Sequence, residues 1–171
     1  MNNKYRVCGI KRLWLIWVVV LNAFAELSCA ASDVWIEAED FTDKGVWVVD
    51  TQFTHLMGSA YLMAPGVLAP AGAASTSFNV GDAGAYAVWV RSKDWVPEFH
   101  PGKFRVSIDG NECGGILGAS GKSGWAWERV AEVDLSSGGH RLSIEDLSGA
   151  LARCDVVWLT TDIRLVGTVP M

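Results

Sequence analysis

Hydrophobic and polar residues alternate along most of the chain, which is the pattern of β-strands with one buried face. Turn-forming residues (Gly, Pro, Asn, Asp, Ser) separate these segments, and no stretch has the period of an amphipathic helix. We expect strands at 34–41, 46–49, 60–63, 75–80, 86–91, 104–108, 116–117, 125–135, 142–144 and 154–160. Many short strands in succession predict an all-β fold, a sandwich of the jelly-roll kind.

The first expected strand, 34–41, carries an unusual pair of carboxylates. Its alternation places Val34, Ile36 and Ala38 on one face, and Trp35, Glu37, Glu39 and Phe41 on the other. The rise of a strand sets Glu37 and Glu39 roughly 7 Å apart, where like charges repel. A bound cation would relieve that repulsion, and oxygen ligands suit calcium. A solvated strand face explains the same pattern without a metal.

Residues 1–30 have the pattern of a secretory signal peptide. Basic residues precede the apolar run 13–24, which is too short for a transmembrane span of roughly 20 residues. Small residues follow, so that cleavage after Ala25, Ala30 or Ala31 is open. We therefore expect a secreted or periplasmic protein with one domain, 31–171. Cys29 raises the alternative of an outer-membrane lipoprotein, which Glu26 disfavours because such signals usually have Leu there.

The charge of the expected mature chain argues against one class of partner. The whole chain has 14 basic and 19 acidic side chains. Without Lys4, Arg6, Lys11, Arg12 and Glu26, 10 basic and 18 acidic side chains remain, a formal charge of −8. Nucleic acid requires basic patches, so we expect no nucleic-acid partner.

Two cysteines, Cys113 and Cys154, lie in the expected mature domain. Export permits a disulfide between them. Two separate thiols, with Cys154 as a small buried apolar residue, are the alternative.

Several segments together resemble the carbohydrate-binding modules of families 6 and 35. The likeness lies in the opening strand 36–41, the "G-x-Y-x-hydrophobic" strand 84–91, the "V-x-I-D-G" hairpin 104–110, the "G-x-H-x-L-x-I" strand 139–144 and the closing strand 154–159. It implies a galactose-binding-domain-like jelly roll that binds polysaccharide without catalysing a reaction.

In the family, a structural calcium is held by acids of the first and last strands. The resemblance assigns that role to Glu37, Glu39 and Asp155, with a metal-free carboxylate cluster as the alternative.

A narrower likeness is to a module attached to bacterial FAD-dependent oxidoreductases and xanthan-lyase-like proteins. The segments 58–62, 89–95, 146–149 and 153–155 carry it. No strand is followed by the G-x-G-x-x-G fingerprint of a flavin site, so the enzymatic part of such proteins is absent from this sequence. The resemblance implies a role in polysaccharide degradation.

Seven tryptophans follow residue 30, and their positions differ. Trp35, Trp89 and Trp158 fall within expected strands, and we expect them in the core. Trp95, Trp125 and Trp127 lie in or beside loops, where exposed rings can cover the apolar faces of sugars. Arg91 and Arg153 could pair with a uronic-acid carboxylate. These five side chains are the candidate carbohydrate site, with capping of the sandwich ends and structural ion pairs as the alternatives.

Enzyme activity is the less favoured interpretation. No G-x-S-x-G is present, and the three histidines lack metal-ligand spacing. Tyr61, His100 and Arg91 could act as the base, acid and charge neutraliser of a polysaccharide lyase, but no spacing requires it. A structural or protein-interaction sandwich of the cell envelope is the other alternative.

Overall fold

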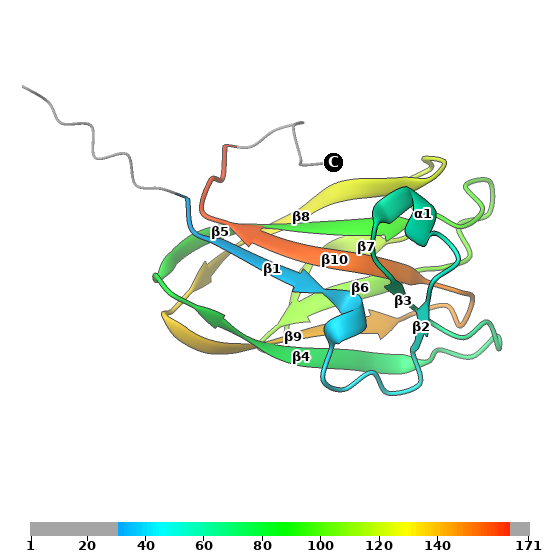
Figure 1. Ribbon diagram of the computed structural model, residues 1–171, viewed down its shortest axis with the longest axis horizontal. Helices are drawn as coiled ribbons and strands as arrows, with labels where there is room; N and C mark the ends of the chain where they lie inside the picture. Colours follow the sequence, from blue (N-terminus) through cyan, green and yellow to red (C-terminus); the bar gives the residue numbers. More distant parts are fainter. Residues whose placement is uncertain (1–30, 165–171) are drawn as a thin grey trace, which may run out of the picture.

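The computed structural model describes residues 31–164, and these form two antiparallel β-sheets packed face to face (Figure 1). The six-stranded sheet has the order β2 (Val48–Asp50), β3 (Tyr61–Met63), β10 (Arg153–Thr160), β5 (Gly84–Lys93) and β8 (Trp125–Leu135), and β1 (Asp33–Glu37) pairs with β10. The four-stranded sheet has the order β4 (Gly72–Val80), β9 (Gly138–Asp146), β6 (Phe104–Ile108) and β7 (Asn111–Leu117). The predicted all-β sandwich is therefore confirmed.

The core lies between the two sheets and is built by the alternation seen in the sequence. Val88 and Val90 of β5 are fully buried, and so are Phe104 and Val106 of β6 in the opposite sheet. Alternate residues of a strand point to opposite faces, so each of these strands contributes every second side chain to the core. The expected strand 125–135 has the bounds of β8, and most other strands are found within a few residues of their expected ends.

The two ends of the domain are adjacent because β1 pairs with β10, from Asp33 opposite Thr160 to Glu37 opposite Val156. The predicted strand 34–41 is wrong in its second half. The strand ends at Glu37, and a 3-10 turn follows at Ala38–Asp40, closed by a hydrogen bond from the Phe41 N–H to the Ala38 carbonyl. The turn buries the Phe41 ring in the core, which a continued strand would have pointed outward.

The chain crosses between the sheets four times at one end of the sandwich, through the segments 64–71, 94–103, 118–124 and 147–152. A single helical turn, α1 (Thr54–Met57), lies at the same end (Figure 1). The sequence pattern did not predict α1, because one turn is too short to show a helical period. This crossover end therefore gathers loops from both sheets.

Other expectations also need correction. Trp35 is not a core residue, because its side chain lies on the outer face of the six-stranded sheet and is 45% exposed.

Cys113 and Cys154 are free, buried thiols. They belong to opposite sheets, Cys113 to β7 and Cys154 to β10. Burial raises the pKa of both thiols.

The predicted signal peptide and its cleavage sites lie outside the described residues. Within 31–164, no helix is long and apolar enough to cross a membrane.

Candidate functional site

The structure brings the three predicted metal-ligating carboxylates together. Glu37 ends β1, Glu39 lies in the 3-10 turn, and Asp155 lies on β10 beside a bulge. One carboxylate oxygen from each lies within 4.8 Å of the others. The bulge interrupts the β5–β10 register between Cys154 and Val156, and the Asp155 side chain there is fully buried.

Each carboxylate of this cluster has a different set of partners. The Asp155 carboxylate accepts hydrogen bonds from Arg91 Nε and from the Ser59 hydroxyl. Glu37 Oε1 accepts the indole N–H of Trp35 at 2.7 Å. The other oxygen of Glu37 and one oxygen of Glu39 are buried and have no hydrogen-bond partner among residues 31–164. Unpaired buried oxygens of this kind are suited to a hard cation such as calcium.

The pKa values of the cluster reflect its crowding. Burial, with the nearby charges of Glu37 and Asp155, raises the pKa of Glu39 to about 7. Burial also raises the pKa of Asp155, against the opposing effect of Arg91. The cluster therefore holds its negative charge at a free-energy cost, and a cation bound between the carboxylates would reduce that cost.

Three of the five predicted carbohydrate-binding residues line one groove, which we call the Trp125 groove. It has a volume of about 330 Å³ and is lined by Leu56, Met57, Arg91, Gly124, Trp125 and Trp127. The Arg91 guanidinium lies 5.5 Å from the centre of the Trp127 ring, and Arg91 is paired with Trp127 across β5 and β8. The groove thus combines two indole rings with a cation that is also bound to Asp155.

A cluster of aromatic side chains packs against Trp125. The Trp125 ring meets Tyr61 edge-on at 4.8 Å, and Phe53 stacks on Tyr61 at 6.0 Å. The buried Tyr61 hydroxyl donates a hydrogen bond to Asp50, and Lys93 Nζ lies 4.9 Å from the Phe53 ring. Leu56, Met57 and Phe53 were not predicted as site residues, because nothing in their spacing shows that α1 packs beside β8.

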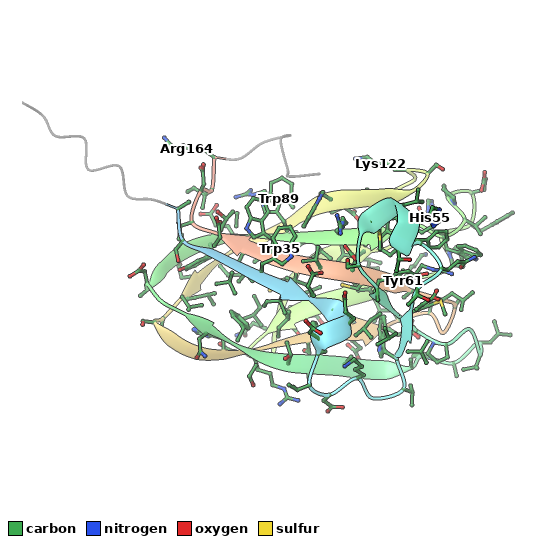
Figure 2. All side chains as sticks on the ribbon, in the orientation of Figure 1. Trp35, His55, Tyr61, Trp89, Lys122 and Arg164 are labelled. Carbon is green, nitrogen blue, oxygen red and sulfur yellow. The ribbon has the colours of Figure 1, made fainter. Side chains whose placement is uncertain are left out.

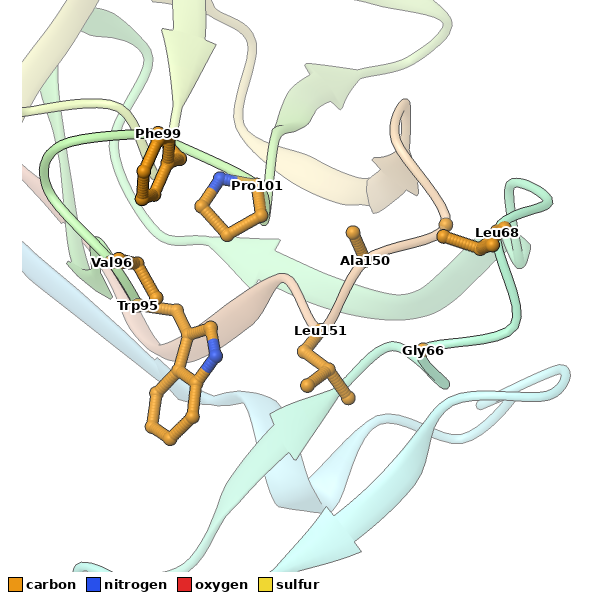
Figure 3. Close-up of a pocket in the computed structure, with 9 residues that line it drawn as sticks. Gly66, Leu68, Trp95, Val96, Phe99, Pro101, Ala150 and Leu151 are labelled. Atoms are coloured by element: carbon orange, nitrogen blue, oxygen red, sulfur yellow. The ribbon is translucent and has the colours of Figure 1, made fainter.

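The other two predicted residues, Trp95 and Arg153, lie together elsewhere at the crossover end. The Arg153 guanidinium stacks over Trp95 at 4.0 Å, and burial lowers the pKa of Arg153. Trp95 lines a second hollow of about 310 Å³, which we call the Trp95 hollow (Figure 3). The other lining residues are Gly66, Leu68, Val96, Phe99, Pro101, Gly149, Ala150 and Leu151. Its side chains are almost entirely apolar, so it offers few partners for sugar hydroxyls.

The three residues of the lyase alternative have separate partners. Burial, and then the hydrogen bond to Asp50, raise the pKa of Tyr61 to about 12, so its phenol stays protonated at neutral pH. His100 Nδ1 is instead 2.6 Å from the buried Asp94 carboxylate, which also accepts the Gly121 N–H. Arg91 is bound to Asp155. The contacts of Asp94 with His100 and Gly121 join the 94–103 and 118–124 loops. Tyr61, His100 and Arg91 each bind a different partner and do not form a set of base, acid and cation.

Two stacked antiparallel sheets with this topology define the class: the fold is that of the β-sandwich carbohydrate-binding modules of families 6 and 35. No protein-family model matches the chain, and no curated protein matches its sequence. The likeness is to solved structures.

One such structure is the C-terminal family 6 module of a marine laminarinase from Zobellia galactanivorans, with a TM-score of 0.58 and 17% identity. The match covers 76% of this chain and 100% of that module. A family 35 module from Clostridium thermocellum gives a TM-score of 0.58 at 18% identity, with 75% and 98% covered. A family 6 module of a Cellvibrio mixtus lichenase, solved with cellotriose, gives 0.53 at 19% identity, with 75% and 96% covered.

Proposed function

We propose that this protein is a non-catalytic carbohydrate-binding module and that the Trp125 groove is its sugar site. The observation that carries the proposal is that Trp125, Trp127 and Arg91 line the same groove. Indole rings cover the apolar C–H faces of sugars, and a guanidinium donates several hydrogen bonds to hydroxyl or carboxylate oxygens. The fold shared with carbohydrate-binding modules supports this proposal.

The cations near the groove favour an acidic polysaccharide as the ligand. Arg91 lines the groove, and Lys93 lies two residues further along β5, above the Phe53 ring. The chain as a whole carries a formal charge of −5, and Arg91 Nε is bonded to Asp155, so Lys93 and the other N–H groups of Arg91 are the cationic donors near the groove. A uronic-acid carboxylate would complement it.

We further propose that Glu37, Glu39 and Asp155 hold a structural calcium ion. The two unpaired, buried oxygens of Glu37 and Glu39 support this assignment. When bound, calcium would supply positive charge between strands from the two ends of the domain. We also propose that the protein is exported by its amino-terminal segment and acts in polysaccharide degradation, as its resemblance to modules of oxidoreductases and xanthan-lyase-like proteins suggests.

The test is binding to an array of neutral and acidic glycans, followed by titration calorimetry with Trp125→Ala. We expect this change to weaken binding at least about tenfold, which corresponds to about 1.4 kcal/mol, because the ring that covers the sugar is removed. Since Trp125 also packs on Tyr61, circular dichroism and thermal melting must show that the variant is folded.

Phe99→Ala is the matched control, because Phe99 is 79% exposed and lines the Trp95 hollow instead. We expect no change in glycan affinity. Loss of binding with Phe99→Ala and not with Trp125→Ala would move the site to the Trp95 hollow. If the wild-type protein binds no glycan on the array, the proposed function is wrong.

A further inference from the structure

The outer face of the six-stranded sheet carries a group of tryptophans that the sandwich core does not need. In an antiparallel sheet of a sandwich, the face away from the core is normally polar. Here Trp89 and Trp158 are only 6% and 5% exposed, and with Ala87 they form a buried cluster separate from the main core. Because Trp89 and Trp158 lie on the outer face, other side chains must cover them to exclude solvent.

Trp127 and Trp35 provide that cover. The Trp127 ring lies 6.1 Å from Trp158, and the Trp35 ring lies 5.5 Å from Trp127 and 6.0 Å from Trp158. Trp35 is the outermost member and remains 45% exposed. Figure 2 shows that Trp35 and Trp89 lie on the same side of the six-stranded sheet as α1, where His55 is labelled.

The contacts of Trp35 fix how its ring is presented. Its indole N–H donates to Glu37 Oε1 at 2.7 Å, and two ring neighbours support it from below. The single polar atom of the side chain is therefore occupied, and the part left exposed is an apolar ring surface of fixed orientation. A preorganised flat surface of this kind binds with little loss of side-chain entropy.

Trp127 connects this surface to the Trp125 groove. It lines the groove and also contacts Trp35. Trp125 and Trp127 are two residues apart on β8, so the rise of the strand sets them about 7 Å apart on the same face. Trp125, Trp127 and Trp35 thus follow one another from α1 toward the edge strand β1, and we call this series the aromatic path.

We propose that the aromatic path binds successive sugar rings of a polysaccharide, so that the protein recognises an internal stretch of the chain. The inference rests on the proposed function, with the Trp125 groove as the first subsite and Trp35 as a distal subsite. Polar side chains border the path, among them the ion pair of Arg129 with Glu132 and the Asp33 carboxylate that accepts the Trp158 N–H. They can meet the hydroxyls at the rim of a bound sugar.

The size of the exposed surface favours a sugar over a protein partner. A tryptophan side chain has a surface of about 150–250 Å², so the exposed part of Trp35 is roughly 100 Å². A stable protein interface buries about 800 Å² on each partner. One exposed ring within a polar border is far below that size, whereas it matches the face of one sugar ring.

The test is the dependence of affinity on oligosaccharide length. The wild-type protein, Trp35→Ala and Trp35→Phe are titrated calorimetrically with oligomers from disaccharide to hexasaccharide of the glycan that the array identifies. For the wild type, we expect affinity to rise with length. For Trp35→Ala, we expect short oligomers to bind as before and the longest to bind about tenfold more weakly. Trp35→Phe keeps an aromatic ring and should retain most of the gain with length.

Val48→Ala is the control for a general effect of trimming an exposed apolar side chain of the same sheet, since Val48 is 46% exposed. If Trp35→Ala is unfolded by circular dichroism, Trp35→Lys, whose alkyl chain can still cover Trp158, takes its place. An unchanged length dependence in the folded variant would overturn the distal subsite and leave the Trp125 groove intact. Absence of glycan binding by the wild type would overturn both. Self-association lost with Trp35→Ala, together with unchanged glycan binding, would instead identify a protein contact.

Discussion

Asp155 connects the carboxylate cluster to the proposed sugar groove. Its carboxylate receives Arg91, which lines the Trp125 groove, and it lies beside Glu37 and Glu39. The side chain is fully buried, so removing one partner of the pair would leave a buried charge uncompensated. A substitution of Asp155 would therefore change both the stability of the fold and the position of Arg91 in the groove. Glu39 is the better residue for testing the cluster.

Glu39 makes stability depend on pH in a specific direction. Its pKa is raised from 4.5 to about 7 in the folded state. Its contribution to stability is therefore fully present below about pH 4.5 and is lost as the pH rises through about 7. Without calcium, we expect the melting temperature of the wild type to fall between pH 5 and pH 8, and Glu39→Gln to reduce that fall. Thermal melts in chelator at both pH values provide the measurement.

Added calcium should reverse the fall in melting temperature at high pH only when the Glu39 carboxylate is present. We expect added calcium to raise the melting temperature of the wild type at pH 8, and to do so much less for Glu39→Gln. Glu98→Gln, which changes an exposed acid in the 94–103 loop, is the control and should behave like the wild type. Identical calcium responses of the wild type and Glu39→Gln would contradict the metal assignment.

At the scale of elements, a single histidine joins two turns at the end opposite the crossover loops. His140 at the start of β9 has Nδ1 2.6 Å from an oxygen of Asp109, in the β6–β7 hairpin turn. Its other ring nitrogen is 2.8 Å from the Ser136 carbonyl, in the β8–β9 turn. Asp109 also accepts the Arg141 N–H at 2.8 Å. These contacts hold two turns against each other, and they depend on charge.

The His140–Asp109 pair should stabilise the fold in a bounded range of pH. The Asp109 hydrogen bond raises the pKa of His140, so its contribution is present below about 6.5 and is lost as the pH rises through the folded value. The His140 hydrogen bond lowers the pKa of Asp109, so its contribution is lost as the pH falls below about 3.8. We expect His140→Gln to lower the melting temperature most near pH 5 and least at pH 9. Melting curves of the two proteins across this range test it, and a constant difference would contradict it.

At the scale of the whole molecule, one side of the sandwich is closed by close approach of β7 to β8. Gly114 of β7 has φ +69°, and a Cβ atom there would lie 1.9 Å from the carbonyl oxygen of Val130 in β8. The two strands belong to different sheets, so the absence of a side chain at Gly114 sets how closely the sheet edges meet.

Gly114→Ala should therefore be strongly destabilising. We expect a loss of more than about 2 kcal/mol in the free energy of unfolding, from backbone strain and displacement of β8 together. Gly110→Ala is the control, because Gly110 has φ +81° but open space around its Cβ position, so it reports the strain alone. Urea denaturation of both variants gives the comparison. Equal losses would show that the approach of β7 to β8 does not matter.

Much of the architecture could be predicted from the alternation of residues. The period of two identified β5 and β6 and separated the side chains of their two faces, because a strand that buries one side needs an apolar residue at every second position. The resemblance also selected three carboxylates that the pairing of β1 with β10 brings together. Local pattern did not show that the first strand ends at Glu37, because that turn depends on the burial of Phe41 in the core.

Alternation and residue types were enough to predict the all-β class, most of the strands and the side chains available for sugar and cation binding. Which of these side chains meet depends on the three-dimensional packing. It separated Trp95 and Arg153 from Trp125, Trp127 and Arg91, and it placed Trp35 on the outer face of the sheet. The physical reason is that alternation reports which side of a strand is buried. The loops and sheet faces that come into contact depend on strand order and on packing between residues far apart in the chain.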